Sequence, residues 1–184
     1  MTPFALLMAL AACQHDAPPA PPAPPPAPVV TLCGTGAIDG SPLCAAFAAM
    51  NETALPDGGT RIVLVSHGQP ALAIRVMGAK MTVKRLDHGK LDLTRSFDLS
   101  DKERRALADA GAAWSVLTPD ADNPVADCKF LNYIAAETGA GGDYKYAVSG
   151  CVALAPLVRL ADAYLAIATE HVPELKQGLE QSLD

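Results

Sequence analysis

The side chains of this chain most able to do chemistry are its histidines, serines and cysteines. His67, His88 and His171 do not form the His-Glu-x-x-His arrangement of a zinc protease. The serines stand outside the Gly-x-Ser-x-Gly and Ser-x-x-Lys patterns of known serine nucleophiles. A hydrolytic site assembled from distant segments, with His67 or His88 beside an acidic residue, stays open as an alternative. The motifs themselves predict no catalytic residue, cofactor or metal ligand.

Four of the five cysteines lie after residue 30, at positions 33, 44, 128 and 151. Their spacings contain no Cys-x-x-Cys or Cys-x-x-x-Cys pair, which disfavours zinc and redox-active sites. An even number of cysteines favours disulfides. Of the three possible connectivities, we expect Cys33 with Cys44 and Cys128 with Cys151, because each closes a short local loop. On the chain-entropy argument each bond would stabilise the fold by about 3 kcal/mol.

The remaining cysteine, Cys13, ends an apolar leader. Residues 4–12 form an unbroken apolar run, too short to span a bilayer and of the right length for a signal-peptide core. The run ends in Leu10-Ala11-Ala12-Cys13, which resembles the lipobox of bacterial lipoproteins. Residues 1–3 lack the Lys or Arg that a signal peptide normally carries. The resemblance covers the leader alone.

The resemblance implies a lipid anchor on Cys13. In that family the cysteine thiol receives a diacylglycerol, a dedicated peptidase cuts before the cysteine, and the new amine is usually acylated. Two or three acyl chains give stable attachment, because each buried methylene contributes about 0.8 kcal/mol. Gln14, rather than an aspartate, follows the cysteine, and the sorting rule of enteric bacteria then implies the outer membrane, with the protein facing the periplasm.

A tract of prolines spaced by alanines follows the lipobox, with prolines at positions 18, 19, 21, 22, 24, 25, 26 and 28. Such a tract forms an extended polyproline helix and cannot pack as a helix or a sheet. At roughly 3.1 Å per residue it would hold a domain up to about 50 Å from the bilayer. We therefore divide the chain into a signal peptide (1–12), a lipidated cysteine with a Pro/Ala-rich tether (13–29) and a single folded domain (30–184).

The charge distribution bears on partners. The formal net charge is −6, which disfavours nucleic acid as a partner because nucleic-acid-binding proteins usually carry a basic face. The middle of the chain is nevertheless locally basic, and Lys84, Arg85 and Lys90 in its second predicted hairpin form a candidate interaction surface for an acidic partner or for anionic lipid. Interleaved acids leave solvated strand and helix faces as the competing interpretation.

The elements expected to position these residues begin with a helix after Ser41-Pro42 that ends near Asn51. Residues 61–66 and 71–77 predict a first hairpin around His67-Gly68-Gln69-Pro70. Alternating apolar residues from Met81 to Leu93 predict a second hairpin around Asp87-His88-Gly89-Lys90.

Helices and further strands are expected after the hairpins. Ser100 and Glu103 match the capping box that starts a helix. Residues 127–134 and 143–148 are consistent with strands, although 130–137 is equally consistent with a helix. Apolar periodicity predicts a long docked helix over 152–168 and a short helix over 173–183. Together these elements predict an α+β domain, in which an antiparallel sheet of two or more hairpins has helices packed on one face.

The functional hypothesis is a lipid-anchored, periplasm-facing protein of the cell envelope that needs no cofactor. Its domain would be a non-enzymatic binding module, with the membrane as one partner through the anchor and an envelope protein or polymer as another. Two alternatives stay open. One is the periplasmic hydrolase with a site outside known motifs, and the other is an inhibitor or immunity-type protein that uses the basic hairpins against an acidic site.

Overall fold

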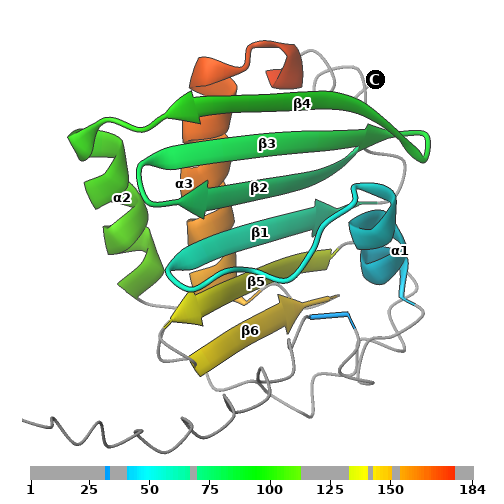
Figure 1. The fold of residues 1–184 in the computed structure, drawn as a ribbon, viewed down its shortest axis with the longest axis horizontal. Helices are drawn as coiled ribbons and strands as arrows, with labels where there is room; N and C mark the ends of the chain where they lie inside the picture. Colours follow the sequence, from blue (N-terminus) through cyan, green and yellow to red (C-terminus); the bar gives the residue numbers. More distant parts are fainter. Residues whose placement is uncertain are drawn as a thin grey trace, which may run out of the picture.

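A computed structural model describes residues 32–33, 41–66, 70–112, 133–140, 143–150 and 154–176. Six antiparallel strands form one sheet in the order β4-β3-β2-β1-β5-β6 (Figure 1). The strands are β1 (Gly59–Val65), β2 (Ala71–Met77), β3 (Lys80–Asp87), β4 (Lys90–Asp98), β5 (Tyr133–Ala140) and β6 (Asp143–Ser149). Three helices accompany them: α1 (Pro42–Ala49), α2 (Asp101–Ala112) and α3 (Ala155–His171). The predicted α+β class with an antiparallel sheet is confirmed.

The first four strands form a meander of consecutive hairpins, and both predicted hairpins are confirmed. The tip of the β3–β4 hairpin is His88-Gly89, where φ is 47° at His88 and 76° at Gly89. Positive φ at both central residues is the geometry that matches a two-residue turn to the twist of the strands. Histidine tolerates this conformation better than most side chains do, so the turn forms at the predicted position.

Strand β5 joins the sheet on the far side of β1, and its residues settle the ambiguity over 130–137. Thr60 to Val65 pair antiparallel with Thr138 to Tyr133. The helical alternative is therefore wrong for the part of the segment from Tyr133 onward. The apolar residues of this segment show neither the helical nor the strand period clearly. The segment forms a strand because it can pair with the edge of β1, which buries Ala135 and Ala136.

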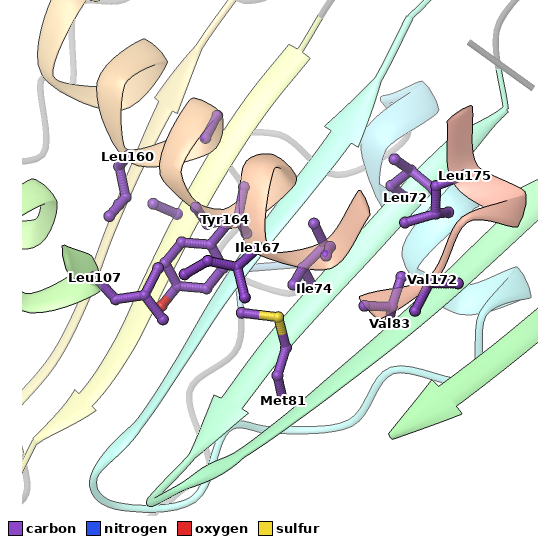
Figure 2. Packing of buried hydrophobic residues seen from close by; sticks show 14 of the residues in the cluster. Leu72, Ile74, Met81, Val83, Leu107, Leu160, Tyr164, Ile167, Val172 and Leu175 are labelled. Atoms are coloured by element: carbon purple, nitrogen blue, oxygen red, sulfur yellow. The ribbon is translucent and has the colours of Figure 1, made fainter. Parts of the chain in front are cut away.

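The main core lies between the sheet and the two longer helices. Ile74, Met81 and Val83 on the sheet pack beneath Tyr164 and Ile167 of α3 (Figure 2). Helix α2 packs against α3 and contributes Leu107 to the same core. The short helical turn at residues 174–176 adds the fully buried Leu175. The capping box is confirmed, because Ser100 Oγ accepts a hydrogen bond from the Glu103 amide and Glu103 Oε2 accepts one from the Ser100 amide.

Helix α1 lies on the opposite face of the sheet from α2 and α3 (Figure 1). It begins at Ser41, whose Oγ accepts a hydrogen bond from the Cys44 amide, as the Ser-Pro signal predicts. Leu43 and Phe47 pack with Leu32 and with Val63 in a second, smaller core. The sheet thus has helices on both faces, because α1 carries apolar residues that need a second buried surface.

Candidate functional site

One of the predicted disulfides lies in the described residues and joins the N-terminal start of the domain to α1. Cys33 and Cys44 are bonded, with their Cα atoms 5.5 Å apart. Leu32, just before this bond, is fully buried in the smaller core. The pairing of Cys33 with Cys44 is confirmed. Cys128 and Cys151 lie outside the described residues, as do Cys13 and His67.

Arg61 forms the centre of a buried cluster of charges beneath α1. Its side chain is 0% exposed, and its register partner on β5 is Glu137. Nε donates to Glu137 Oε2 over 2.6 Å, and Nη2 lies 2.6 Å from the same oxygen without hydrogen-bond geometry. On the other side, Nη1 donates to Glu52 Oε2 over 2.7 Å and to the Thr53 carbonyl over 2.8 Å. The guanidinium also lies over the Phe47 ring, 4.2 Å from its centroid.

Lys84 completes this charge cluster, which consists of Arg61, Lys84, Glu52 and Glu137. Its Nζ donates to the Met50 carbonyl and lies 2.7 Å from Glu52 Oε1. Burial alone would raise the pKa of Glu52, but the hydrogen bonds from Lys84 and Arg61 outweigh it and hold the pKa below its usual value. Two cations and two carboxylates balance, so the cluster is neutral, and Arg61 Nη2 is its one buried nitrogen without a hydrogen bond among the described residues.

Tyr144 and the backbone of Leu32 satisfy the remaining oxygen of Glu137. The Tyr144 hydroxyl and the Leu32 amide both donate to Oε1. Burial and the adjacent Glu137 carboxylate raise the pKa of Tyr144, which keeps its hydroxyl protonated as a donor. The charge cluster therefore joins the start of the domain, the segment after α1 and three strands. We interpret its role as structural.

A groove of about 510 Å³ lies beside α1, at the end of the β3–β4 hairpin. Its lining is mainly apolar, from Ala45, Ala46 and Ala49 of α1 and from Val65, Ala71 and Leu86 of the sheet. His88 and Asp87 stand at its edge, with His88 Nδ1 2.8 Å from Asp87 Oδ1. The His88 side chain is 93% exposed, so the pair lies in solvent at the rim of the groove.

A second histidine lies between two helices. His171 at the end of α3 stacks on Phe97, with ring centroids 4.1 Å apart, and its Nε2 lies 2.6 Å from Glu103 Oε1. Hydrogen bonds from Ser100 and from His171 lower the pKa of Glu103 to about 2. In a serine hydrolase the histidine stands between serine and acid, whereas here Glu103 stands between Ser100 and His171. The arrangement joins α2 to α3 and does not activate Ser100.

The three basic residues predicted as one interaction surface lie in different environments. Lys84 and Arg85 are consecutive on β3 and project from opposite faces of the sheet. Lys84 belongs to the charge cluster, while Arg85 binds Asp92 and the Glu174 carbonyl. Lys90 is exposed at the start of β4. The structure does not bring these residues together into one surface.

Sequence reasoning missed the charge cluster because Arg61 and Glu137 are 76 residues apart and belong to no local motif. Arg61 directly before an apolar run was an available signal, since a charged side chain in such a strand must be buried with a partner or mark an exposed face. Across the described residues, no group of three His, Cys, Asp or Glu side chains is arranged to hold a metal ion.

Comparison of the chain with protein-family models, with curated proteins and with solved structures gave no match.

Proposed function

We propose that this protein is a lipid-anchored component of the bacterial cell envelope, in which Cys13 carries the lipid and the folded domain is a non-enzymatic interaction module facing the periplasm. The observation that carries the proposal is the disulfide between Cys33 and Cys44. Stable disulfides form in oxidising compartments and are rare in the cytosol. This one follows the lipobox-like segment by 20 positions, so the two features support the same compartment.

The interaction role is supported by the exposed side of α1. The helix contains no charged residue, and Ala45, Ala48 and Ala49 are exposed at its surface. A helix that is apolar all round is normally buried. In this protein the outer side of α1 instead borders the apolar groove, which suits contact with an envelope protein or polymer. Among the described helices, none is long and apolar enough to cross a membrane, and attachment is assigned to the lipid.

Lipidation is tested by metabolic labelling with a fatty-acid analogue in a bacterial host. The wild-type chain should incorporate the label and fractionate with membranes, and Cys13→Ser should lose both properties. Cys44→Ser is the matched control, because it replaces another cysteine, one whose sulfur is held in the disulfide with Cys33, and should keep the label. Labelling that survives Cys13→Ser would refute the anchor.

The interaction role is tested in the same host with a photo-crosslinking amino acid at Ala49 of the full chain. The same amino acid at Arg105, exposed on α2, is the control. The proposal predicts a discrete adduct from position 49 and none from position 105. Absence of an adduct at position 49 would contradict an interaction through α1.

A further inference from the structure

The part of the α1-bearing face formed by β2, β3 and β4 carries the cations Arg75 and Lys80, with the carboxylate of Asp98 beside Lys80. In Figure 1 this face is toward the viewer, and no helix or strand of the described chain stands in front of it beyond α1. Strand alternation and the register place Arg75 and Met77 of β2, Lys80 and Thr82 of β3, and Thr94, Ser96 and Asp98 of β4 on it. We call these seven side chains the open face.

Arg75 is the residue of the open face whose charge is least balanced. It stands directly opposite Arg61 on β1 and opposite Thr82 on β3. Residues directly opposite in antiparallel strands have Cβ atoms about 4.5–5.5 Å apart, and like charges at this spacing destabilise a sheet. On β3 its diagonal neighbours are Lys80 and Lys84. Every charged side chain at these positions is therefore a cation.

The nearby carboxylates are already engaged. Glu52 and Glu137 bind Arg61 and Lys84, and together these four charges cancel. Asp98 lies 3.2 Å from Lys80 in a pair whose side chains are 58% and 80% exposed, an arrangement of little energetic value that a competing anion can replace. Within the described chain Arg75 has no ion-pair partner, although it is half-buried. One positive charge of this face is left without a counter-charge.

The groups around Arg75 suit a carboxylate. A guanidinium offers parallel N–H donors that bind a carboxylate through two hydrogen bonds. Thr82 Oγ1 and Ser96 Oγ are 2.9 Å apart, so one hydroxyl donates to the other and the second hydroxyl hydrogen is available to a ligand. Lys80 adds a long-range attraction, and Met77 offers an apolar contact to the stem of an acidic side chain.

We propose that the open face binds an acidic peptide segment of a partner protein, with a carboxylate on Arg75 and further acidic residues near Lys80. This inference names the partner chemistry for the interaction role proposed above and rests on that role. It replaces the surface expected from Lys84, Arg85 and Lys90 with residues that the sheet places on one face. In a chain of net charge −6, a local basic face also orients an acidic partner.

The test is calorimetric titration of the purified full chain with a hexaglutamate peptide at low salt, with hexalysine as the charge control. Hexaglutamate should bind and hexalysine should not. Arg75→Gln should weaken hexaglutamate binding about tenfold or more, because a hydrogen-bonded charge pair is lost. Lys145→Gln is the matched control: it removes an exposed positive charge from the opposite face, since Lys145 pairs with Thr138, and should leave the affinity unchanged within about twofold.

A second readout is the stability of the free protein. Because the charged residues at the register positions around Arg75 are cations and Arg75 has no ion-pair partner in the described chain, Arg75→Gln should leave the urea midpoint unchanged or raise it. A lowered midpoint would contradict the uncompensated charge. Equal affinity of wild type and Arg75→Gln for hexaglutamate would overturn the site, as would binding of polyphosphate or anionic vesicles without binding of hexaglutamate. Crosslinking at Ala49 with no peptide binding would overturn this inference alone and leave the interaction role standing.

Discussion

Arg61 is the residue on which the α1-bearing half of the molecule depends most directly. Its guanidinium contacts Glu52, Glu137, the Thr53 carbonyl and the Phe47 ring, and so connects two strands to α1 and the segment that follows it. Burying an ion pair is not by itself stabilising, because desolvation opposes the attraction between the charges. Removing one member is costly, however, because its partners then remain charged and buried.

We therefore expect Arg61→Met to lower the free energy of unfolding by about 3–5 kcal/mol, since Glu52 and Glu137 would lose their shared cation. Urea unfolding followed by circular dichroism measures this change. Arg159→Met on the exposed side of α3 is the control and should have an effect below about 0.5 kcal/mol. A loss below about 1 kcal/mol for Arg61→Met would show that the cluster carries little of the stability.

Acid should weaken the contact between α2 and α3 through Glu103. The pKa of this carboxyl is lowered from its ordinary value to about 2 by hydrogen bonds from Ser100 and His171. A group with a lowered folded-state pKa stabilises the fold above its unfolded-state pKa, and this contribution is lost as the pH falls through the folded-state pKa. The lowered pKa of Glu52 acts in the same direction.

The melting temperature should therefore decline as the pH falls from about 4.5 toward about 2. Glu103→Gln should melt at a lower temperature at neutral pH, because the carboxylate that binds Ser100 and His171 is missing. Its melting temperature should also decline less steeply with pH, because the glutamine has no carboxylate that acid can protonate. Thermal melts across this range measure both effects. Asp162→Asn, at an exposed position of α3, should reproduce the wild-type decline. A Glu103→Gln decline as steep as that of the wild type would exclude Glu103 as a cause.

At the scale of elements, the segment between α1 and β1 lies directly on the sheet, and two glycines permit this. A Cβ atom built on Gly139 of β5 would lie 2.7 Å from the Pro56 carbonyl oxygen. A Cβ atom on Gly59 of β1 would lie nearest to the Met77 sulfur, at 2.5 Å. The Gly58 amide also donates to the Gly139 carbonyl. The close approach places Glu52 and Thr53 where they reach Arg61.

Gly139→Ala should consequently destabilise the protein by about 1–3 kcal/mol. The new methyl group would meet the Pro56 backbone, which cannot move without disturbing the charge cluster. Gly59→Ala should cost less, since the end of a methionine side chain can turn away and the Pro56 carbonyl oxygen lies farther from this Cβ, at 3.0 Å. Urea midpoints of the two variants test the ranking. Wild-type stability of Gly139→Ala would contradict the close packing of this segment.

The sequence predicted the elements whose signals are local. Ser100 with Glu103 indicated the start of α2, and Ser41 with Pro42 indicated the start of α1, because the capping hydrogen bonds join residues close in sequence. His88-Gly89 indicated a hairpin turn, because the positive φ at these two residues is a local property. The choice between helix and strand before residue 137 depended on pairing with β1, which no local pattern encodes.

The candidate sites were harder to predict for the same reason. Cys33 with Cys44 was predicted because the loop between them is short, and the structure confirms it. The cluster could not be predicted because Arg61, Glu52 and Glu137 come from three separate segments. The uncompensated charge of Arg75 could not be predicted either, because it follows from the strand register that places Arg61 opposite Arg75. The faces to which Lys84 and Arg85 point also follow from the sheet rather than from their positions in a basic stretch.

At the scale of the whole molecule, the proposed order of parts is anchor, tether, disulfide and domain. The disulfide fastens the start of the domain to α1, and the buried Leu32 amide binds Glu137 at the same place. A force applied to the proposed tether would therefore act on the charge cluster around Arg61 before it acted on the main core. The open face and the groove beside α1 both lie on this side of the sheet, which is the side proposed to meet partners.

We propose that the mature protein begins at a lipidated Cys13 and carries its domain in an oxidised state. Intact mass of the protein extracted from bacterial membranes, with and without reductant, tests it most directly. We expect a chain that starts at Cys13, carries added acyl mass and gains about two daltons on reduction for each disulfide, including Cys33–Cys44. An unprocessed chain whose cysteines are all free thiols would contradict it and would place the domain in a reducing compartment.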